Sequence, residues 1–383
     1  MKKAIVVIIA FIITLLIFVY YNHSALNKAG NSNSANITNS EHSVKGVADA
    51  NNAQEATAAE SCDAIKFKDV QLEKEIREIL KKPEGAISTW DVQNIKELVL
   101  GGFDTKNISD LGCLTKLEYL SISNEYDSIP VKNQQAGASS DIGTDLSALS
   151  KLEHLEVLYL DELGISDISP LSNLLRLKRL SLKGNKITDI KALTALNSLE
   201  YLHLGYGNNI RDISPLKGKS RLDTLWLNES KLEAAENTKV LAGLTNLRML
   251  SIGDCGIDSI SSLKELSLLE ELYMGRNNIK DLTPVKAMKH LKVLYAPDNG
   301  IKNIACISGL SKLESLSLEY NKIENIRVLG NLTNITSIHF ENNNIKDFSV
   351  LKDIPNLQEA YFTGNPGTNS SPRKTDIFES RGD

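Results

Sequence analysis

The sequence predicts an α/β solenoid, in which short supersecondary units stack along a single parallel sheet. The main observation is a period of 22 residues that runs from Leu155 to Leu357. Only the third and fourth intervals depart from this period, by one and three residues. A fixed short period is the signature of a solenoid, whose units pack only against their neighbours. The units start at Leu155, Leu177, Leu199, Leu222, Leu247, Leu269, Leu291, Leu313, Ile335 and Leu357.

Each unit combines a strand, a polar turn and an apolar return segment. After Leu177, the alternation of Leu180 and Leu182 with polar residues indicates a short strand that buries one face. Several return segments contain Asp-Ile-Ser-Pro-Leu or a similar run, as at 167–171. Proline at this place favours a single 3₁₀ turn over a long helix.

An asparagine follows the strand in most units. Its side-chain amide can bond backbone groups of its own turn and of the next one, so that it is satisfied when buried. We therefore interpret these residues as a structural ladder and not as catalytic residues: Asn185, Asn208, Asn277, Asn299, Asn321, Asn343 and Asn365. Where Leu163, Ser230 and Cys255 replace the asparagine, we expect less regular turns.

The period, the asparagine and the apolar positions together resemble the leucine-rich repeat family, specifically the 22-residue class of internalins and their bacterial relatives. The resemblance covers residues 64–365 and implies a right-handed horseshoe of about 12 repeats. It implies a concave parallel sheet and a convex side of 3₁₀ helices and turns over residues 95–365. Two less regular repeats start near Ile95 and Leu117, and the polar insertion at 123–145 is expected to form a loop, either disordered or ligand-binding.

Residues 62–94 do not follow the repeat and are expected to cap its first unit with helices. Asp69 is a candidate N-cap of a helix that ends near Pro83 and Gly85. The apolar face of this helix is formed by Leu72, Ile76, Ile79 and Leu80. A second short turn is expected after Ser88. The cap resembles that of internalin-type proteins in the spacing of Phe67, Asp69, Leu72, Ile76, Asp91 and Ile95.

Residues 1–21 are predicted to be a signal-anchor or a signal peptide. Lys2 and Lys3 precede an uncharged apolar run at 4–21, which is just long enough to span a bilayer. This run favours an uncleaved anchor, with cleavage and secretion as the alternative. The lysines predict a cytoplasmic N-terminus and an extracytoplasmic remainder. Residues 22–61, rich in Asn, Ala and Ser, are expected to be a disordered linker.

The four cysteines form neither a disulfide framework nor a metal-binding motif. Cys62 could pair with Cys113, although free thiols are favoured. No phosphate-binding glycine loop, zinc signature or nucleophile elbow is found in the sequence. We therefore expect no enzymatic activity, cofactor or bound metal. His203 and His339 lie six repeats apart, about 29 Å by strand spacing, and cannot form a dyad.

The residue between the two core positions of each strand is expected to point onto the concave face. Tyrosine and tryptophan are concentrated there and at neighbouring outward positions. Aromatic residues on a rigid platform are typical of binding hot spots, and the strand preference of tyrosine is the alternative explanation. The predicted ligand-binding residues of this kind are Tyr159, Tyr201, His203, Trp226, Tyr273, Tyr295 and Tyr361.

Acidic residues are predicted to complete the site on the C-terminal half of this face. Glu319 and Glu341 occupy the same position in adjacent repeats, so their strands lie about 4.8 Å apart. Like charges side by side cost stability, which favours a cationic partner; a solvated acidic rim is the alternative. Glu271 and Asp298 are further members of the predicted site. Nucleic acid is disfavoured as a partner because no basic stripe is present.

The sequence thus predicts an extracytoplasmic binding module, membrane-tethered or secreted, that binds a protein ligand of a host or bacterial surface. Glycan or cell-wall binding by the same aromatic residues is one alternative. An intracellular scaffold is another, since the repeat also resembles the leucine-rich-repeat regulatory subunit of protein phosphatase 1; the run at 4–21 argues against it. In the tail at 366–383, the terminal Arg381-Gly382-Asp383 resembles an integrin-recognition tripeptide.

Overall fold

The computed structural model describes residues 64–101, 108–123 and 145–367. All of them belong to one compact unit, residues 60–383. The predicted anchor (1–21), the linker (22–61), Cys62, residues 124–144 of the insertion and the tail from 368 lie outside the described residues. No helix among the described residues is long and apolar enough to cross a membrane.

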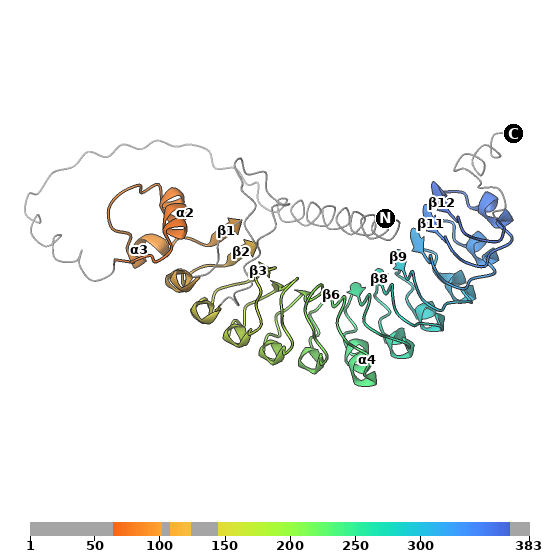
Figure 1. Cartoon of the computed structure of the whole chain (residues 1–383), viewed down its shortest axis with the longest axis horizontal. Coiled ribbons are helices and arrows are strands. Elements are labelled where there is room, and N and C mark those ends of the chain that lie inside the picture. The colour runs from red at the N-terminus through yellow and green to blue at the C-terminus, as the bar shows by residue number, and fades with distance from the viewer. Residues whose placement is uncertain (1–63, 102–107, 124–144, 368–383) are drawn as a thin grey trace, which may run out of the picture. The chain divides into compact units, whose positions relative to one another are not determined.

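The described part of the chain forms one open parallel sheet of twelve strands in sequence order, the inner layer of a leucine-rich repeat horseshoe (Figure 1). The strands are β1 (Glu97–Gly101), β2 (Tyr119–Ser123), β3 (Val157–Asp161), β4 (Arg179–Ser181), β5 (Tyr201–His203), β6 (Thr224–Trp226), β7 (Met249–Ser251), β8 (Glu271–Tyr273), β9 (Val293–Tyr295), β10 (Ser315–Ser317), β11 (Ser337–His339) and β12 (Glu359–Tyr361).

Corresponding repeat positions pair with one another from strand to strand. Leu158, Leu180 and Leu202, for example, stand side by side and are fully buried. β2 and β3 pair in the same register although the insertion separates them in sequence. Because each unit places its apolar residues at the same height, the core is one continuous stack, as a solenoid requires.

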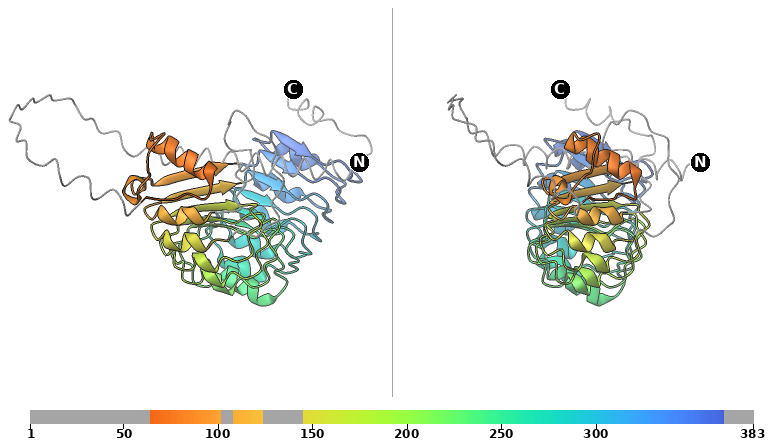
Figure 2. Two further views of the ribbon diagram at one scale, coloured as in Figure 1. Left: turned by 60° about the vertical axis from the view of Figure 1, so that its left-hand side comes forward. Right: turned by 90° about the vertical axis from the view of Figure 1, so that its left-hand side faces the viewer.

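Short 3₁₀ helices line the convex side, opposite the strands (Figure 2). They are η2 (Ser109–Cys113), η3 (Ser147–Lys151), η4 (Ser169–Leu171), η5 (Lys191–Leu193), η6 (Ser214–Leu216), η7 (Ser261–Glu265), η8 (Thr283–Ala287), η9 (Ala305–Gly309), η10 (Arg327–Asn331) and η11 (Ser349–Asp353). At η4 and η6 an aspartate stands two residues before the Ser-Pro pair and forms an Asx turn: the backbone N–H of Ser169 donates to Asp167 Oδ1 at 2.8 Å. Asp212 accepts from the N–H of Ser214 before η6 in the same way.

The irregular interval of the repeat has a structural cause. Between β6 and β7, the α-helix α4 (Ala235–Ala242) replaces the 3₁₀ helix and accommodates the three extra residues. Asn237 in α4 remains tied to the preceding unit, because its amide accepts from Ile213 N–H at 3.2 Å and donates to Arg211 O at 2.8 Å.

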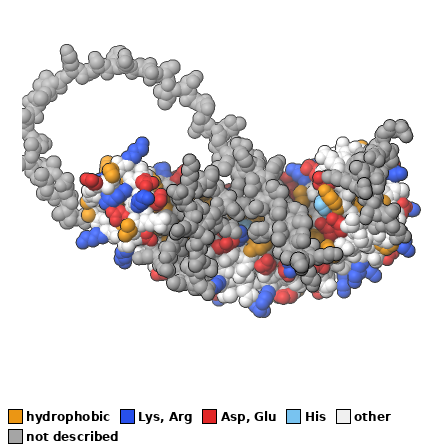
Figure 3. All heavy atoms as spheres, turned by 45° about the horizontal axis from the view of Figure 1, so that its top comes forward, with side chains coloured by type: hydrophobic (Ala, Val, Ile, Leu, Met, Phe, Trp, Pro, Cys, Tyr) orange, Lys and Arg blue, Asp and Glu red, His pale blue; other side chains and the backbone are white. Residues whose placement is uncertain are grey.

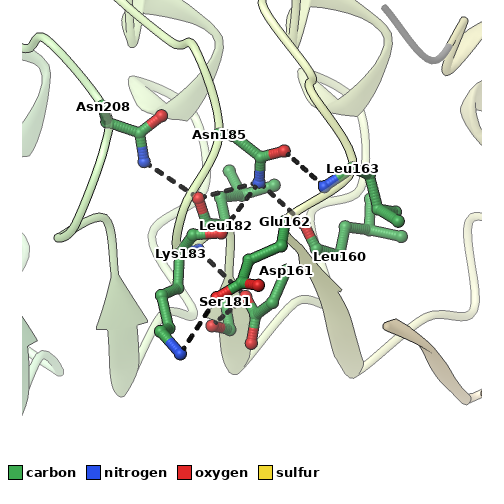
Figure 4. A network of polar contacts seen from close by, with 9 residues as sticks. All are labelled: Leu160, Asp161, Glu162, Leu163, Ser181, Leu182, Lys183, Asn185 and Asn208. Carbon is green, nitrogen blue, oxygen red and sulfur yellow. Dashed lines mark hydrogen bonds and ion pairs between the residues drawn. The ribbon is translucent and has the colours of Figure 1, made fainter. Parts of the chain in front are cut away.

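The asparagine side chains connect successive turns (Figure 4). Asn185 Oδ1 accepts hydrogen bonds from the backbone N–H groups of Leu163 and Ile165, at 3.1 and 3.0 Å. Its Nδ2 donates to Leu160 O at 2.7 Å and to Leu182 O at 2.9 Å. Each amide thus provides hydrogen-bond partners for buried backbone N–H and C=O groups of two successive units. The turn of a single unit could not pair these groups by itself.

The prediction of less regular turns at the three positions without asparagine is wrong for the backbone. The residues before these positions, Glu162, Glu229 and Asp254, have φ values of 62, 67 and 55°. Arg276, which precedes a ladder asparagine, has a φ of 58°. Core packing on both sides therefore imposes the same left-handed turn whatever side chain follows. At the third position, the Cys255 thiol donates to Leu227 O at 3.2 Å.

Among the described residues, two helices precede β1: α2 (Val70–Leu80) and α3 (Thr89–Val92). Asp69 caps α2, accepting from the N–H groups of Gln71 and Leu72. Leu72 and Ile76 are buried, but the predicted inward position of Ile79 is wrong, since this residue is 47% exposed. The helix ends at Leu80, before Pro83, because Lys81 adopts a left-handed conformation.

Candidate functional site

The strand register arranges the predicted binding residues in a single column on the concave side of the sheet. The position between the two core residues is occupied, from β3 to β12, by Tyr159, Ser181, His203, Trp226, Ser251, Tyr273, Tyr295, Ser317, His339 and Tyr361. Tyr201 lies one column away, at the start of β5. Neighbouring members of a column are one strand spacing apart, about 4.8 Å.

Five rings form a continuous aromatic band, which we define as Tyr206, His203, Trp226, Tyr273 and Tyr295. His203 and Trp226 stack with centroids 5.3 Å apart and an interplanar angle of 15°. Trp226 and Tyr273 stack at 6.0 Å and 17° although β7 lies between their strands. Tyr206 and Tyr295 extend the two ends, at 5.9 Å from His203 and 6.1 Å from Tyr273.

Two rings of the band bridge over the strand between them. Two strand spacings amount to about 9.6 Å, so Trp226 and Tyr273 must lean toward each other above β7 to approach within 6.0 Å. Ser251 of β7 is fully buried. Its hydroxyl has no hydrogen-bond partner among the described residues. The small side chain of Ser251 therefore leaves the space in which the two rings stack.

The band is less exposed than the sequence predicts. His203 and Tyr273 retain only 5% and 7% of their accessible surface, whereas Trp226 and Tyr295 are half-buried. Burial lowers the pKa of His203 to about 3, with a smaller contribution from Lys183, so the ring is neutral at physiological pH. Tyr273 donates its hydroxyl proton to Glu271 Oε2 at 2.8 Å. Burial raises the pKa of the Glu271 carboxyl.

A glycine beside the band determines how Tyr295 lies. A Cβ atom at Gly275 would come within 2.9 Å of Pro297 Cγ and 3.1 Å of Tyr295 Cε1. The Tyr295 ring therefore occupies space that any other residue at 275 would fill. Sequence reasoning did not identify Gly275, because its role depends on the ring of the next repeat.

A separate polar group lies at the N-terminal end of the face. The Arg179 guanidinium stands 4.4 Å above the Tyr201 ring and its Nε donates to the Tyr159 hydroxyl at 3.0 Å. Asp161 accepts hydrogen bonds from the Ser181 hydroxyl and from Lys183 N–H. Burial raises the pKa of Asp161 to about 6, although these hydrogen bonds oppose the shift.

The four predicted acidic residues do not form one patch. Glu319 and Glu341 follow β10 and β11 and lie beside His339, whereas Glu271 is bonded to Tyr273. Asp298 is exposed on a left-handed turn at the edge of the face. The pKa of Glu319 is raised to about 7, mainly by burial and further by Glu341, against the hydrogen bond from the Ser317 hydroxyl.

The comparisons with known proteins agree with this architecture. Residues 153–195, 175–218 and 245–287 match the family described as Leucine Rich repeats (2 copies). The solved structure of an internalin, InlF, from Listeria monocytogenes is 28% identical, with a TM-score of 0.66, over 80% of this chain and 93% of that chain. Segments 153–218 and 245–287 are thus leucine-rich repeats, and the chain is similar in fold to the internalins.

Two further solved structures share the leucine-rich repeat fold at lower identity. One is a leucine-rich repeat protein of Leptospira interrogans, 21% identical, with a TM-score of 0.53 over 74% of this chain and 79% of that chain. The other is the ectodomain of the Arabidopsis thaliana receptor kinase GASSHO1/SCHENGEN3 in complex with CASPARIAN STRIP INTEGRITY FACTOR 2, 17% identical, with a TM-score of 0.51 over 73% and 40%. No curated protein matches the chain.

On the described residues that are visible in Figure 3, Lys and Arg side chains are interspersed with Asp and Glu. Among the described residues, Cys113, Cys255 and Cys306 form no disulfide with one another. Burial raises the pKa of the Cys255 thiol to about 12, so it is a poor nucleophile. Cys62 lies outside the described residues, so its pairing with Cys113, the alternative to the favoured free thiols, stays untested.

Proposed function

We propose that this protein is an extracytoplasmic binding module that engages a protein ligand through the aromatic band. The observation that carries the proposal is the continuous series of ring contacts from Tyr206 to Tyr295, stacked at the centre and tilted at both ends, over β5 to β9. Rings that hold one another in place lose little further conformational entropy when a ligand binds. Tyr and Trp in such an arrangement are typical hot-spot residues.

The stacking favours a protein ligand over a sugar. A sugar ring usually packs flat against an exposed aromatic face, but the faces of Trp226 are turned toward His203 on one side and Tyr273 on the other. The exposed parts of the half-buried Trp226 and Tyr295 remain for contact with apolar side chains and backbone groups of a protein. Glycan binding is accordingly the alternative that the experiment must distinguish.

The location of the module is also part of the proposal. The apolar run at 4–21 would hold the protein in the membrane, or direct its secretion if cleaved, and residues 22–61 would separate it from the bilayer. Similarity to InlF supports an internalin-like module. Protease accessibility of the repeats on intact cells tests the location directly, since an intracellular scaffold would be protected.

The ligand is tested by affinity capture on the immobilised protein, from surface proteins and from purified cell-wall glycans in parallel. The captured ligand is identified, and its Kd is then measured against the wild type and Trp226→Ala. Loss of a hot-spot tryptophan should weaken binding by about 30-fold, which corresponds to about 2 kcal/mol.

Trp90→Ala is the matched control. Trp90 lies on the cap in α3 and is 71% exposed, so its removal should leave ligand affinity and folding unchanged. Equal affinity of Trp226→Ala and wild type would refute the aromatic band as the binding site. Capture of a glycan without capture of any protein would show that the ligand is a glycan and not a protein.

A further inference from the structure

Three side chains with metal-binding groups converge at the C-terminal part of the concave face, outside the aromatic band. Glu319 and Glu341 each stand two residues beyond the end of a strand, β10 and β11, and His339 is the last residue of β11. One ligand atom from each lies within 4.8 Å of the other two. We name these residues the Glu–His–Glu cluster.

The geometry of the cluster is close to what a small cation requires. His339 Nδ1 lies 3.9 Å from Glu319 Oε1. Two ligand atoms bound to one tetrahedral Zn²⁺ at about 2.1 Å are about 3.4 Å apart. Side-chain rotations that move each ligand atom by up to about one ångström would therefore bring all three atoms to bonding distance from a single Zn²⁺.

The charges of the cluster call for a cation. Two carboxylates from equivalent positions of adjacent repeats face each other, and Glu341 Oε2 is buried without a hydrogen-bond partner among the described residues. Both side chains in the Glu319–His339 pair are largely shielded from water. A buried anionic oxygen without a donor costs free energy, and a bound cation would remove that cost.

A neighbouring contact orients the histidine. The Ser337 hydroxyl lies 3.2 Å from His339 Nε2, and the Tyr361 ring stacks on the imidazole at 4.7 Å. These contacts hold the ring with Nδ1 toward the carboxylates, the usual way in which an outer partner fixes a histidine ligand. Imidazole as a ligand favours Zn²⁺ and similar transition metals over Ca²⁺ and Mg²⁺.

We propose that Glu319, His339 and Glu341 bind one divalent transition-metal ion, Zn²⁺ being the best match, with water in the remaining coordination positions. The proposal goes beyond ligand binding by the aromatic band and does not depend on it. In this proposal the paired glutamates are metal ligands, whereas in a solvated acidic rim they would bind no specific ion.

The test is titration of the metal-free, full-length protein with zinc chloride alone, followed by calorimetry and by thermal unfolding. We expect one tight equivalent of Zn²⁺ and a Tm that rises with the free metal concentration. His339→Gln, Glu319→Gln and Glu341→Gln should each weaken binding at least about 10-fold, because loss of even an outer-shell partner has that effect. Ca²⁺ and Mg²⁺ should not compete.

His290→Gln and Glu314→Gln are the controls, since they remove a histidine and a carboxylate elsewhere on the repeats. Both should retain the affinity of the wild type. Thermal unfolding of the Gln variants in chelator shows that they are folded before metal is added. Equal Zn²⁺ affinity of wild type and His339→Gln, or no saturable binding by the wild type, would overturn the proposal, and preferential binding of Ca²⁺ would overturn the choice of metal.

Discussion

The aromatic band on β5–β9 and the Glu–His–Glu cluster beyond β10 and β11 are built on the same repeat, yet their side chains relate to one another in opposite ways. In the band, His203, Trp226 and Tyr273 stack and stabilise each other. In the cluster, Glu319 and Glu341 oppose each other and leave a buried oxygen unpartnered. A repeated backbone places side chains of one kind side by side along the sheet. Neighbouring rings then stack on one another, whereas neighbouring carboxylates repel one another and favour binding of a cation.

The largest effect is expected from Trp226→Ala, which would break the band at its centre. It removes stacking on both sides and uncovers Ser251, so we expect a loss of roughly 3 kcal/mol in the free energy of unfolding. Urea unfolding measures it. A loss no larger than that of Trp90→Ala would show that the stack contributes nothing to stability.

The next largest effect is expected in the pH dependence of stability, through His203 of the aromatic band. The folded-state pKa of His203 is lowered to about 3, and the unfolded value is about 6.5. The unfolded state therefore binds more protons between these values, so the contribution of His203 is complete above pH 6.5 and is lost as the pH falls toward 3. The slope is about 1.4 kcal/mol per pH unit.

His203→Phe preserves the stacking and removes the titration. The difference in unfolding free energy between wild type and His203→Phe should fall steadily from pH 6.5 to pH 4 in urea titrations. A difference independent of pH would mean that the imidazole is solvated in the native protein.

A smaller effect is expected from Gly275→Ala. The added methyl group would meet Pro297 and the Tyr295 ring, so Tyr295 must move away from Tyr273. We expect a destabilisation of about 1 kcal/mol, in the range of modest overpacking, and a changed environment of Tyr295 by NMR. The double variant Gly275→Ala with Tyr295→Ala should recover most of the loss; separate additive losses would exclude the steric explanation.

The smallest effect has the opposite sign. Glu341→Gln removes one of two facing charges, so in chelator it should leave the protein unchanged or stabilise it by up to about 1 kcal/mol. Thermal unfolding of Glu341→Gln beside Glu314→Gln measures this. Destabilisation of Glu341→Gln alone would contradict the charge conflict on which the comparison of the two regions depends.

Much of the fold followed from the period. The strands, their parallel order, the 3₁₀ helices and the leucine-rich repeat class are present as predicted. Exposure was predicted less well, as Ile79 and Tyr273 show, because burial depends on what lies above a residue and not on its place in the pattern. Lys219 is a further case: it occupies an aliphatic position, buried, with Nζ donating to Leu196 O at 3.1 Å.

The sequence by itself determined which residues share a column, because a constant period places equivalent positions side by side whatever they are. Only the tertiary structure decided which of them touch. The rings of Trp226 and Tyr273 meet across a strand because the serine between them is small. The ligand atoms of Glu319, His339 and Glu341 converge because β10 and β11 are in register, although no local motif joins them. Contact between side chains depends on rotamers and on neighbouring volume, and neither is encoded at any single position of the repeat.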